Sequence, residues 1–262
     1  MNLSLLDLLS GWGVSFMLVM TRVSAMMYAF PFFGSPAVAN RIRILITLVL
    51  SFLILPLVGI EGLGNDWGLG QLGLSIGREL AVGLLVGFGT KFMFEAFSLA
   101  GTFAGRQMGF AIADLVDPVT AAPQSMVGQF WALVAILLFL AVNGHHFLIR
   151  LLLQNFEVVP LNTGVLQPAS GRLLITGSTD MFHLALRLAA PALILTMMMD
   201  IGIGVLSRAM PRLQVFFVAL PLKLLVGVFS LVVSLQLFQA IFSTVYADFQ
   251  EYLVSLLASM RS

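Results

Sequence analysis

Ionisable side chains interrupt several long apolar stretches of this chain. They are Arg22, Arg78, Glu79, Lys91, Glu95, His183, Arg187, Asp200 and Lys223. At the centre of a bilayer each would cost about 2.5–3.5 kcal/mol, so such groups pair with one another or line a watery passage. Setting the histidine aside, five cations face three carboxylates. Pairing within these stretches therefore cannot neutralise all of them, and we expect the surplus cations to face partner subunits or a watery passage.

Helical spacing suggests which of these groups pair. Lys91 and Glu95 are four residues apart, which places them on one helix face. Arg78 is expected to pair with its neighbour Glu79 or with another acid. The alternative to intersubunit charges, namely ion pairing wholly within the chain, stays open at this point. We expect buried or intersubunit charges at Arg22, Arg78, Glu79, Lys91, Glu95, Arg187, Asp200 and Lys223.

Residues that typically build catalytic or metal centres are scarce. The chain has no cysteine, and no phosphate-binding G-x-x-x-x-G-K-[ST] motif occurs. His145 and His146 are adjacent, and neighbouring side chains point about 100° apart on a helix, whereas a metal site needs three or four convergent ligands. We therefore predict no metal, no cofactor and no enzymatic activity. An intramembrane enzyme that uses His145 or His146 is the alternative.

The bulk composition indicates a membrane protein. Of the 262 residues, 60% are hydrophobic and 10% are charged, and the mean hydropathy is +1.04. The net charge of +1 leaves no basic field for nucleic acid, so we predict no nucleic-acid partner. The N-terminal residues include Asp7 and no basic region, so we do not expect a cleaved signal peptide. An integral membrane or membrane-derived protein is the class that fits.

Six apolar blocks are long enough to cross a bilayer, for which about 20 residues are needed. They cover residues 12–33, 42–60, 72–103, 130–153, 181–206 and 213–247. The third and sixth would reach roughly 45–50 Å as helices, against a hydrocarbon core of about 30 Å. We expect an all-α fold of long kinked helices and hairpins in one domain over residues 1–262. Gly83, Gly87 and Pro221 are the expected kink or break sites.

Basic residues follow the first, third and fifth blocks. They are Arg41 and Arg43, then Arg106, then Arg208 and Arg212. Because positive charge is retained on the cytoplasmic side, these connections are expected to be cytoplasmic.

The segment 101–123 has the turn residues of a loop and the composition of a core. Gly101, Gly105 and Gly109 are four apart and would form a smooth ridge for close helix packing, as would Gly73 with Gly77 and Gly83 with Gly87. Asp117-Pro118 and Pro123 then break the helix. Apolar side chains between these points must fill a hole or be covered. They are Phe110, Ile112, Leu115 and Val116.

Four stretches of the chain resemble the FliR (SctT) family of type III secretion export-gate proteins. The first runs from Arg22 through Pro31-Phe32-Phe33-Gly34 to Pro36 and Arg41. The others are 94–118 with Gln107-Met108-Gly109 and Asp117-Pro118, 138–145 with Asn143-Gly144-His145, and 211–227 with Pro211, Leu213, Phe216, Pro221 and Val226-Gly227. They follow one another in the family's order and cover the chain almost end to end.

This resemblance implies a structural and gating subunit of the flagellar export channel. The family's partners are several copies of FliP and FliQ, which form a superhelical multi-subunit cone with it, and FlhB, which packs around the cone. The chain would then be a hetero-oligomer subunit at the bacterial inner membrane, in the flagellar basal body, in contact with lipid and with unfolded flagellar export substrates. FlhB is expected to be a separate chain, since no further domain follows Ser262.

The resemblance also implies that the loop from about 106 to 122 is a plug in the channel. We expect an apolar constriction that resists wetting, with charged residues that fix its base. The constriction would consist of Met108, Phe110, Ile112, Leu115 and Val116, and the base of Arg106, Asp114 and Asp117. An ordinary packing loop between subunits is the alternative.

Two other functions stay open. One is the equivalent subunit of a virulence injectisome. The other is a self-contained multipass transporter, in which Arg187 or Asp200 would lie at a substrate site near the middle of the membrane.

Overall fold

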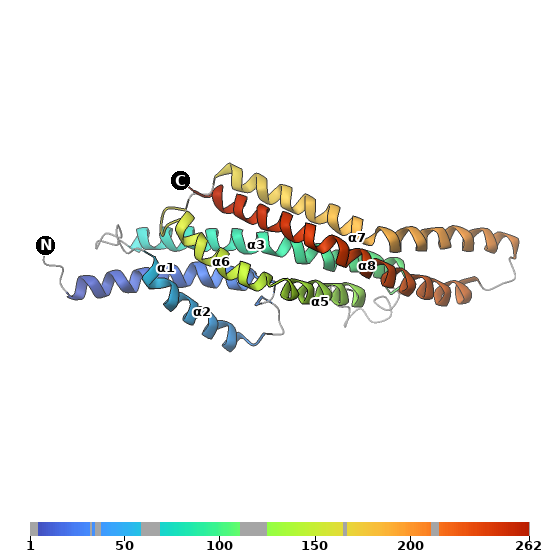
Figure 1. Cartoon of the computed structure of the whole chain (residues 1–262), viewed down its shortest axis with the longest axis horizontal. Helices are drawn as coiled ribbons and strands as arrows, with labels where there is room; N and C mark the ends of the chain where they lie inside the picture. Colours follow the sequence, from blue (N-terminus) through green and yellow to red (C-terminus); the bar gives the residue numbers. More distant parts are fainter. Residues whose placement is uncertain are drawn as a thin grey trace. The chain divides into compact units, whose positions relative to one another are not determined.

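The computed structural model describes residues 5–31, 33–34, 38–58, 69–110, 125–164, 167–210 and 215–261. Over these ranges the fold is all-helical and contains no strand, as predicted (Figure 1). The α-helices are α1 (Leu5–Ala29), α2 (Asn40–Ile54), α3 (Leu69–Gln107), α5 (Met126–Ala141), α6 (Gly144–Val158), α7 (Pro168–Ala209) and α8 (Val215–Ala258), and a 3₁₀ turn, η1 (Leu55–Leu57), follows α2.

Helix breaks differ from those expected. The 39 residues of α3 continue through Gly83 and Gly87, and the 44 residues of α8 continue through Pro221. The break lies instead in the fourth apolar block, where Asn143 adopts a left-handed conformation with φ 58° between α5 and α6. A glycine inside a helix costs only about 1 kcal/mol relative to alanine, which packing against a neighbouring helix readily offsets.

Four helical segments in the described ranges are long and apolar enough to cross a membrane. They are Asn40–Leu57, Leu69–Gln107, Pro168–Ala209 and Phe217–Ala258, and the interrupted pair α5 and α6 would make a fifth. Their burial within the chain differs: 56% of the apolar window is buried in α3, but only 22% in α7 and 17% in α8. Most residues of these apolar windows in α7 and α8 are therefore not buried within the chain.

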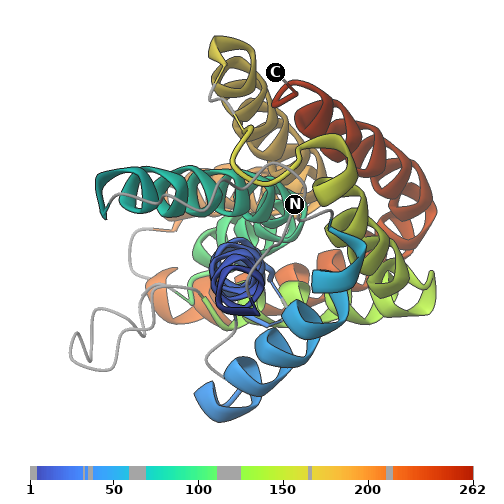
Figure 2. The same cartoon turned by 90° about the vertical axis from the view of Figure 1, so that its left-hand side faces the viewer.

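The chain divides into two compact units, each described here by itself. Unit 1 comprises residues 1–92, 143–177 and 249–262. In it α1 lies between α2 and the beginning of α3, which both views show (Figure 1 and Figure 2). The contact with α3 is close, since a Cβ atom at Gly83 would lie 2.6 Å from the carbonyl oxygen of Arg22. Gly83 and Gly87 therefore serve close packing on α1, as predicted.

Unit 2 comprises residues 93–142 and 178–248. Its core is aromatic: the ring centroid of Phe238 in α8 lies 4.3 Å from that of Phe97 in α3 and 4.7 Å from that of Trp131 in α5. Gly101 of α3 allows α5 to approach, because a Cβ atom there would lie 2.6 Å from Cδ1 of Trp131. The predicted single domain of residues 1–262 stays a prediction.

Glycine pairs at four-residue spacing do not all serve packing. Among the described residues, no heavy atom beyond the local helix lies within 4 Å of a Cβ atom built at Gly73 or Gly77. The expectation of a close helix contact there is therefore wrong for the described part of the chain. These two glycines lie near the start of α3, before the part of that helix that packs on α1.

Candidate functional site

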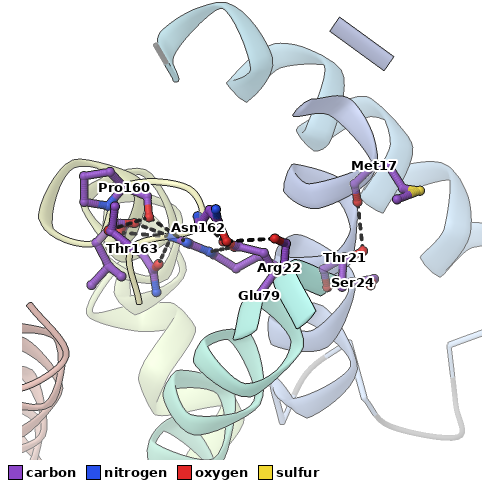
Figure 3. Close-up of polar contacts among 11 residues, drawn as sticks. Met17, Thr21, Arg22, Ser24, Glu79, Pro160, Asn162 and Thr163 are labelled. Carbon is purple, nitrogen blue, oxygen red and sulfur yellow. Dashed lines mark hydrogen bonds and ion pairs between the residues drawn. The ribbon is translucent and has the colours of Figure 1, made fainter. Parts of the chain in front are cut away.

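Unit 1 contains a buried arginine, and each of its three guanidinium nitrogens donates to an acceptor (Figure 3). Arg22 of α1 is fully buried, and its Nε lies 2.5 Å from Oε2 of Glu79 in α3. Its Nη1 donates to Oδ1 of Asn155 at 2.9 Å and to the carbonyl of Val159 at 2.6 Å, and its Nη2 donates to the carbonyl of Pro160 at 3.3 Å. The guanidinium therefore joins α1, α3 and the end of α6.

Glu79 also holds the turn that follows α6. Its Oε1 accepts the backbone N–H of Asn162 at 2.8 Å, and Asn162 is in the left-handed region with φ 64°. The Asn162 side chain is held in turn, because the Ser75 hydroxyl donates to its Oδ1 at 2.8 Å. Charge-assisted hydrogen bonds of this kind satisfy a buried ion pair that would otherwise be costly. This network ties together three segments that are distant in sequence.

A G-x-S-x-G pattern, which is typical of nucleophile elbows, was overlooked at the sequence level. It runs from Gly73 to Gly77. An elbow requires a turn from strand to helix, whereas this segment lies inside α3. Ser75 is buried, and its hydroxyl donates to the carbonyl of Gln71 and to Asn162. The serine therefore belongs to the structural network around Glu79.

The proposed local ion pairs are corrected by this geometry. Glu79 pairs with Arg22 rather than with Arg78, because Glu79 faces the interior of unit 1 while Arg78 is exposed and contacts the carbonyl of Asn162 at 3.4 Å. Lys91 and Glu95, both within the described part of α3, form no ion pair. Glu95 is exposed, and the ammonium of Lys91 lies 5.4 Å from the centroid of the Phe88 ring.

A second polar cluster lies in unit 2. Lys223 Nζ of α8 lies 2.9 Å from Asp200 Oδ2 of α7, and the same oxygen accepts a hydrogen bond from Nε2 of Gln107, the last residue of α3, at 3.1 Å. The cluster is partly solvated, with 44% of the Asp200 side chain and 21% of the Lys223 side chain exposed. Arg187 is exposed as well. Of the expected charged residues in unit 2, Asp200 and Lys223 therefore form an ion pair, whereas Arg187 is exposed.

The predicted loop starts at a well-defined helix end. The N–H of Phe110 donates to the carbonyl of Gly105 at 3.1 Å, and the N–H of Gly109 donates to the carbonyl of Arg106 at 3.2 Å. With Gly109 at φ +99°, these two bonds form a Schellman motif, in which a left-handed residue ends the helix. Glycine is required here because a side chain would strain the left-handed backbone. The helix therefore ends at Gly109, which the four-residue spacing of glycines places on a helical packing ridge. The predicted breaks at Asp117-Pro118 and Pro123 lie outside the described residues.

Three residues of the predicted plug loop lie in the described part of the chain, and their role in a plug stays a prediction. Met108 is completely buried, and its side chain packs over Gly227 of α8. Phe110 is half-buried and Arg106 is exposed. Met108 therefore anchors the helix end in unit 2 rather than projecting from it. The other predicted loop residues, Ile112, Asp114, Leu115, Val116 and Asp117, lie outside the described residues.

The adjacent histidines lie close to each other. The ring centroids of His145 and His146 are 4.2 Å apart near the start of α6. Across the described ranges of the chain, however, no three histidine, aspartate or glutamate side chains gather in a way that could hold a metal ion.

Many large apolar side chains of α7 and α8 are exposed. On α7 it includes Ile194, Met197, Met198, Ile201 and Val205, and on α8 it includes Phe217, Leu225, Val228, Phe229 and Val232. Exposed apolar side chains that gather in patches mark contacts with lipid or with other proteins. The fold and these surfaces together define a helical membrane protein that is built to contact other apolar partners.

Comparison with known proteins shows the family to which the chain belongs. Residues 14–249 match the family described as bacterial export proteins, family 1, and the chain belongs to that family. Similar relatives are the flagellar biosynthetic proteins FliR of Bacillus subtilis (strain 168), 29% identical over 93% of this chain and 95% of the relative, and of Escherichia coli (strain K12), 30% identical over 79% of this chain and 78% of the relative. FliR of Pectobacterium carotovorum is 27% identical over 96% of this chain and 95% of the relative.

The predicted FliR resemblance is thereby confirmed. The chain is a component of the flagellar export apparatus, which acts in flagellum biogenesis and protein export, and its apolar helices are those of a membrane-embedded component.

Proposed function

We propose that this chain is a structural and gating subunit of the flagellar export channel. It assembles with FliP-like and FliQ-like subunits into a superhelical gate at the bacterial inner membrane, with an FlhB-like subunit packed around it. Unfolded flagellar subunits are the cargo. Membership of the bacterial export family and similarity to FliR proteins support this function.

The observation that carries the assembly proposal is the mixed surface of α8. Only 17% of its apolar window is buried within the chain. Its exposed positions nevertheless include Gln236, Gln239, Ser243 and Thr244 among the apolar side chains. Hydrocarbon offers these polar groups no hydrogen bonds, which costs free energy for each one. Helices of sibling subunits satisfy such groups, and polar side chains are common in helix contacts within membranes.

We further propose that the loop at about 106–122 plugs the channel entrance. The Schellman motif at Gly109 ends α3 abruptly, and Met108 holds that end against Gly227. A loop that must be displaced by cargo needs such a fixed base. The apolar side chains beyond it, from Phe110 to Val116, would resist wetting of the closed channel.

Of the alternatives, a self-contained transporter would use Arg187 or Asp200 at its substrate site. Asp200 is already engaged by Lys223 and Gln107, whereas Arg187 is exposed. The injectisome alternative differs in cargo and not in assembly, and the relatives named above are flagellar.

Purification in mild detergent tests the proposal. The tagged full-length chain is co-expressed with the FliP-like and FliQ-like chains of the same bacterium, and the mass of the purified particle is measured. We expect one large complex that contains all three chains. A chain that purifies alone as a stable monomer, and that moves solute by itself in liposomes, would overturn the gate in favour of the transporter.

A further inference from the structure

The end of α7 and the start of α8 form a segment of unit 2 that is hardly buried. We call residues 197–210 and 217–226 the tip, and none of these residues is buried. The residues that flank the tip, Thr196 in α7 and Gly227 in α8, are both buried. Segments with few buried contacts open at a low cost in free energy. Contacts outside a core must therefore hold the tip in one place.

A proline weakens the backbone of each helix near the tip. Pro191 lies inside α7 and Pro221 lies inside α8. Each proline lacks the N–H that would donate to the carbonyl four residues earlier, so one hydrogen bond of each helix is missing. Bends in helices concentrate at such residues. The tip can therefore move while the remainder of both helices stays packed.

One carboxylate ties the tip to the end of α3. Oδ2 of Asp200, in the tip, accepts a hydrogen bond from Nε2 of Gln107 at 3.1 Å and lies 2.9 Å from Nζ of Lys223. Gln107 is held in place, because the next residue, Met108, is completely buried against Gly227. Asp200 therefore joins the α7 side of the tip to its α8 side and to the last residue of α3.

This carboxylate is suited to a contact that opens and closes. In unit 1 the pair Arg22 and Glu79 is buried, and separating it would leave two charges without water. The side chain of Asp200 is 44% exposed and that of Lys223 is 21% exposed, so water can solvate both groups when they part. Exposed pairs of this kind contribute little to stability. The first pair is therefore permanent, whereas the second can be released.

We propose that Asp200 is a positioning residue of the gate. Its contacts with Gln107 and Lys223 form a latch that holds the tip against the end of α3. Opening of the latch lets the tip move away from the helix end at which the proposed plug loop starts. The gating part of this proposal rests on the proposed function, and the latch itself does not.

Distances between spin labels test the latch in the full-length chain in detergent, without partner subunits. The chain contains no cysteine, so labels can be placed in pairs. Glu95→Cys on α3 is combined with Val205→Cys in the tip. A reference pair combines Glu95→Cys with Phe182→Cys, which precedes the proline of α7. All three labelled positions are exposed.

Both label pairs are measured in the unmodified chain, in Asp200→Ala and in a matched control, Asp180→Ala, which removes another exposed acid of α7. We expect Asp200→Ala to broaden the distance distribution between positions 95 and 205 but not that between 95 and 182. Asp180→Ala should change neither. Thermal unfolding should be alike for all variants, because the pair is partly solvated.

Reversal of the charges is the rescue. Asp200→Lys combined with Lys223→Asp should restore the narrow distribution, because the ion pair forms again and the amide of Gln107 can accept as well as donate. An unchanged distribution between 95 and 205 in Asp200→Ala would overturn the latch. Equal broadening of both label pairs would also overturn it, since that result indicates a general loosening of unit 2.

Ion conductance of the complete complex in planar bilayers tests the gating role, with assembly checked by particle mass. Asp200→Ala should raise the conductance of the closed complex, Asp180→Ala should not, and the charge reversal should lower it again. If Asp200→Ala stays closed while deletion of residues 111–116 leaks, the gating role is overturned. If both stay closed, the proposed plug fails instead, and the label distances alone decide the latch.

Discussion

The side chain of Met108 occupies the space that a Cβ atom at position 227 would need. Such an atom would lie 2.5 Å from Cε and 2.9 Å from Sδ of Met108. Met108 is completely buried and precedes the left-handed Gly109 that ends α3. The absence of a side chain at Gly227 therefore leaves room for Met108, which packs there next to the start of the proposed plug loop.

Gly227→Ala should lower the stability of the purified chain by about 1–3 kcal/mol, the usual cost of overpacking. Thermal unfolding in detergent measures this. The double variant Gly227→Ala with Met108→Ala should recover part of the loss, because the overlapping side chain is gone. Gly204→Ala on α7, where a Cβ atom meets nothing within 4 Å, is the control and should not destabilise. Equal effects of Gly227→Ala and Gly204→Ala would contradict the packing argument.

Glu79→Gln should be far more damaging than its small change in shape suggests. It leaves the fully buried Arg22 without its counter-ion, and breaking a buried pair costs about 3–5 kcal/mol. We expect strongly reduced accumulation in membranes and a lowered unfolding temperature. Glu95→Gln, on the exposed side of the same helix, is the matched control and should behave like the unmodified chain. A mild Glu79→Gln phenotype would show that the network is not needed for folding.

Gly101→Ala tests the close approach of α3 and α5. The added Cβ atom would lie 2.6 Å from the carbonyl oxygen of Val127 and from Cδ1 of Trp131, and backbone cannot give way as a flexible side chain can. A loss of about 1–3 kcal/mol is expected. Gly73→Ala in the same helix meets open space and should gain up to about 1 kcal/mol from helix propensity. The free energies of unfolding of the two variants, each purified without partner subunits, are compared. An unchanged free energy of unfolding for Gly101→Ala would contradict the close approach of α3 and α5.

Removal of the loop beyond the Schellman motif should open a leak. Deletion of residues 111–116 spares Phe110, whose N–H completes the motif. We expect higher ion conductance of the closed complex in planar bilayers, because the apolar barrier to wetting is lost. A variant with residues 111–116 scrambled keeps length and composition, and it should stay closed. Unchanged conductance of the deletion variant, with normal assembly, would refute the plug.

Much of the fold was predictable because it depends on local pattern. Long apolar blocks predicted helices, and glycines four apart predicted the contacts at Gly83, Gly87 and Gly101. The break at Asn143, which has φ 58°, was missed although Asn-Gly is a turn signal and asparagine tolerates the left-handed region. Continuity through Pro221 was a matter of context, since prolines are tolerated in apolar helices whose neighbours compensate for the lost hydrogen bond.

The ion pairs were harder to predict. Spacing finds only partners on the same helix, and it favoured Lys91 with Glu95. The observed pairs join Arg22 to Glu79 and Asp200 to Lys223, 57 and 23 residues apart. Such pairs depend on how helices are arranged in space. The aromatic core of unit 2 did leave a signal that was missed, because Phe238, Phe242 and Tyr246 repeat every four residues along α8.

The exposed surface of α8 affects what drives its association with sibling subunits in the proposed assembly. Before siblings arrive, lipid tails must solvate its valines and leucines, and exchanging tails for equally oily neighbours gains little free energy. In the proposed assembly, selection of the correct neighbour then depends on exposed polar groups of α8, such as the amides of Gln236 and Gln239. A neighbouring helix that offers these amides matching hydrogen bonds would be favoured over one that does not.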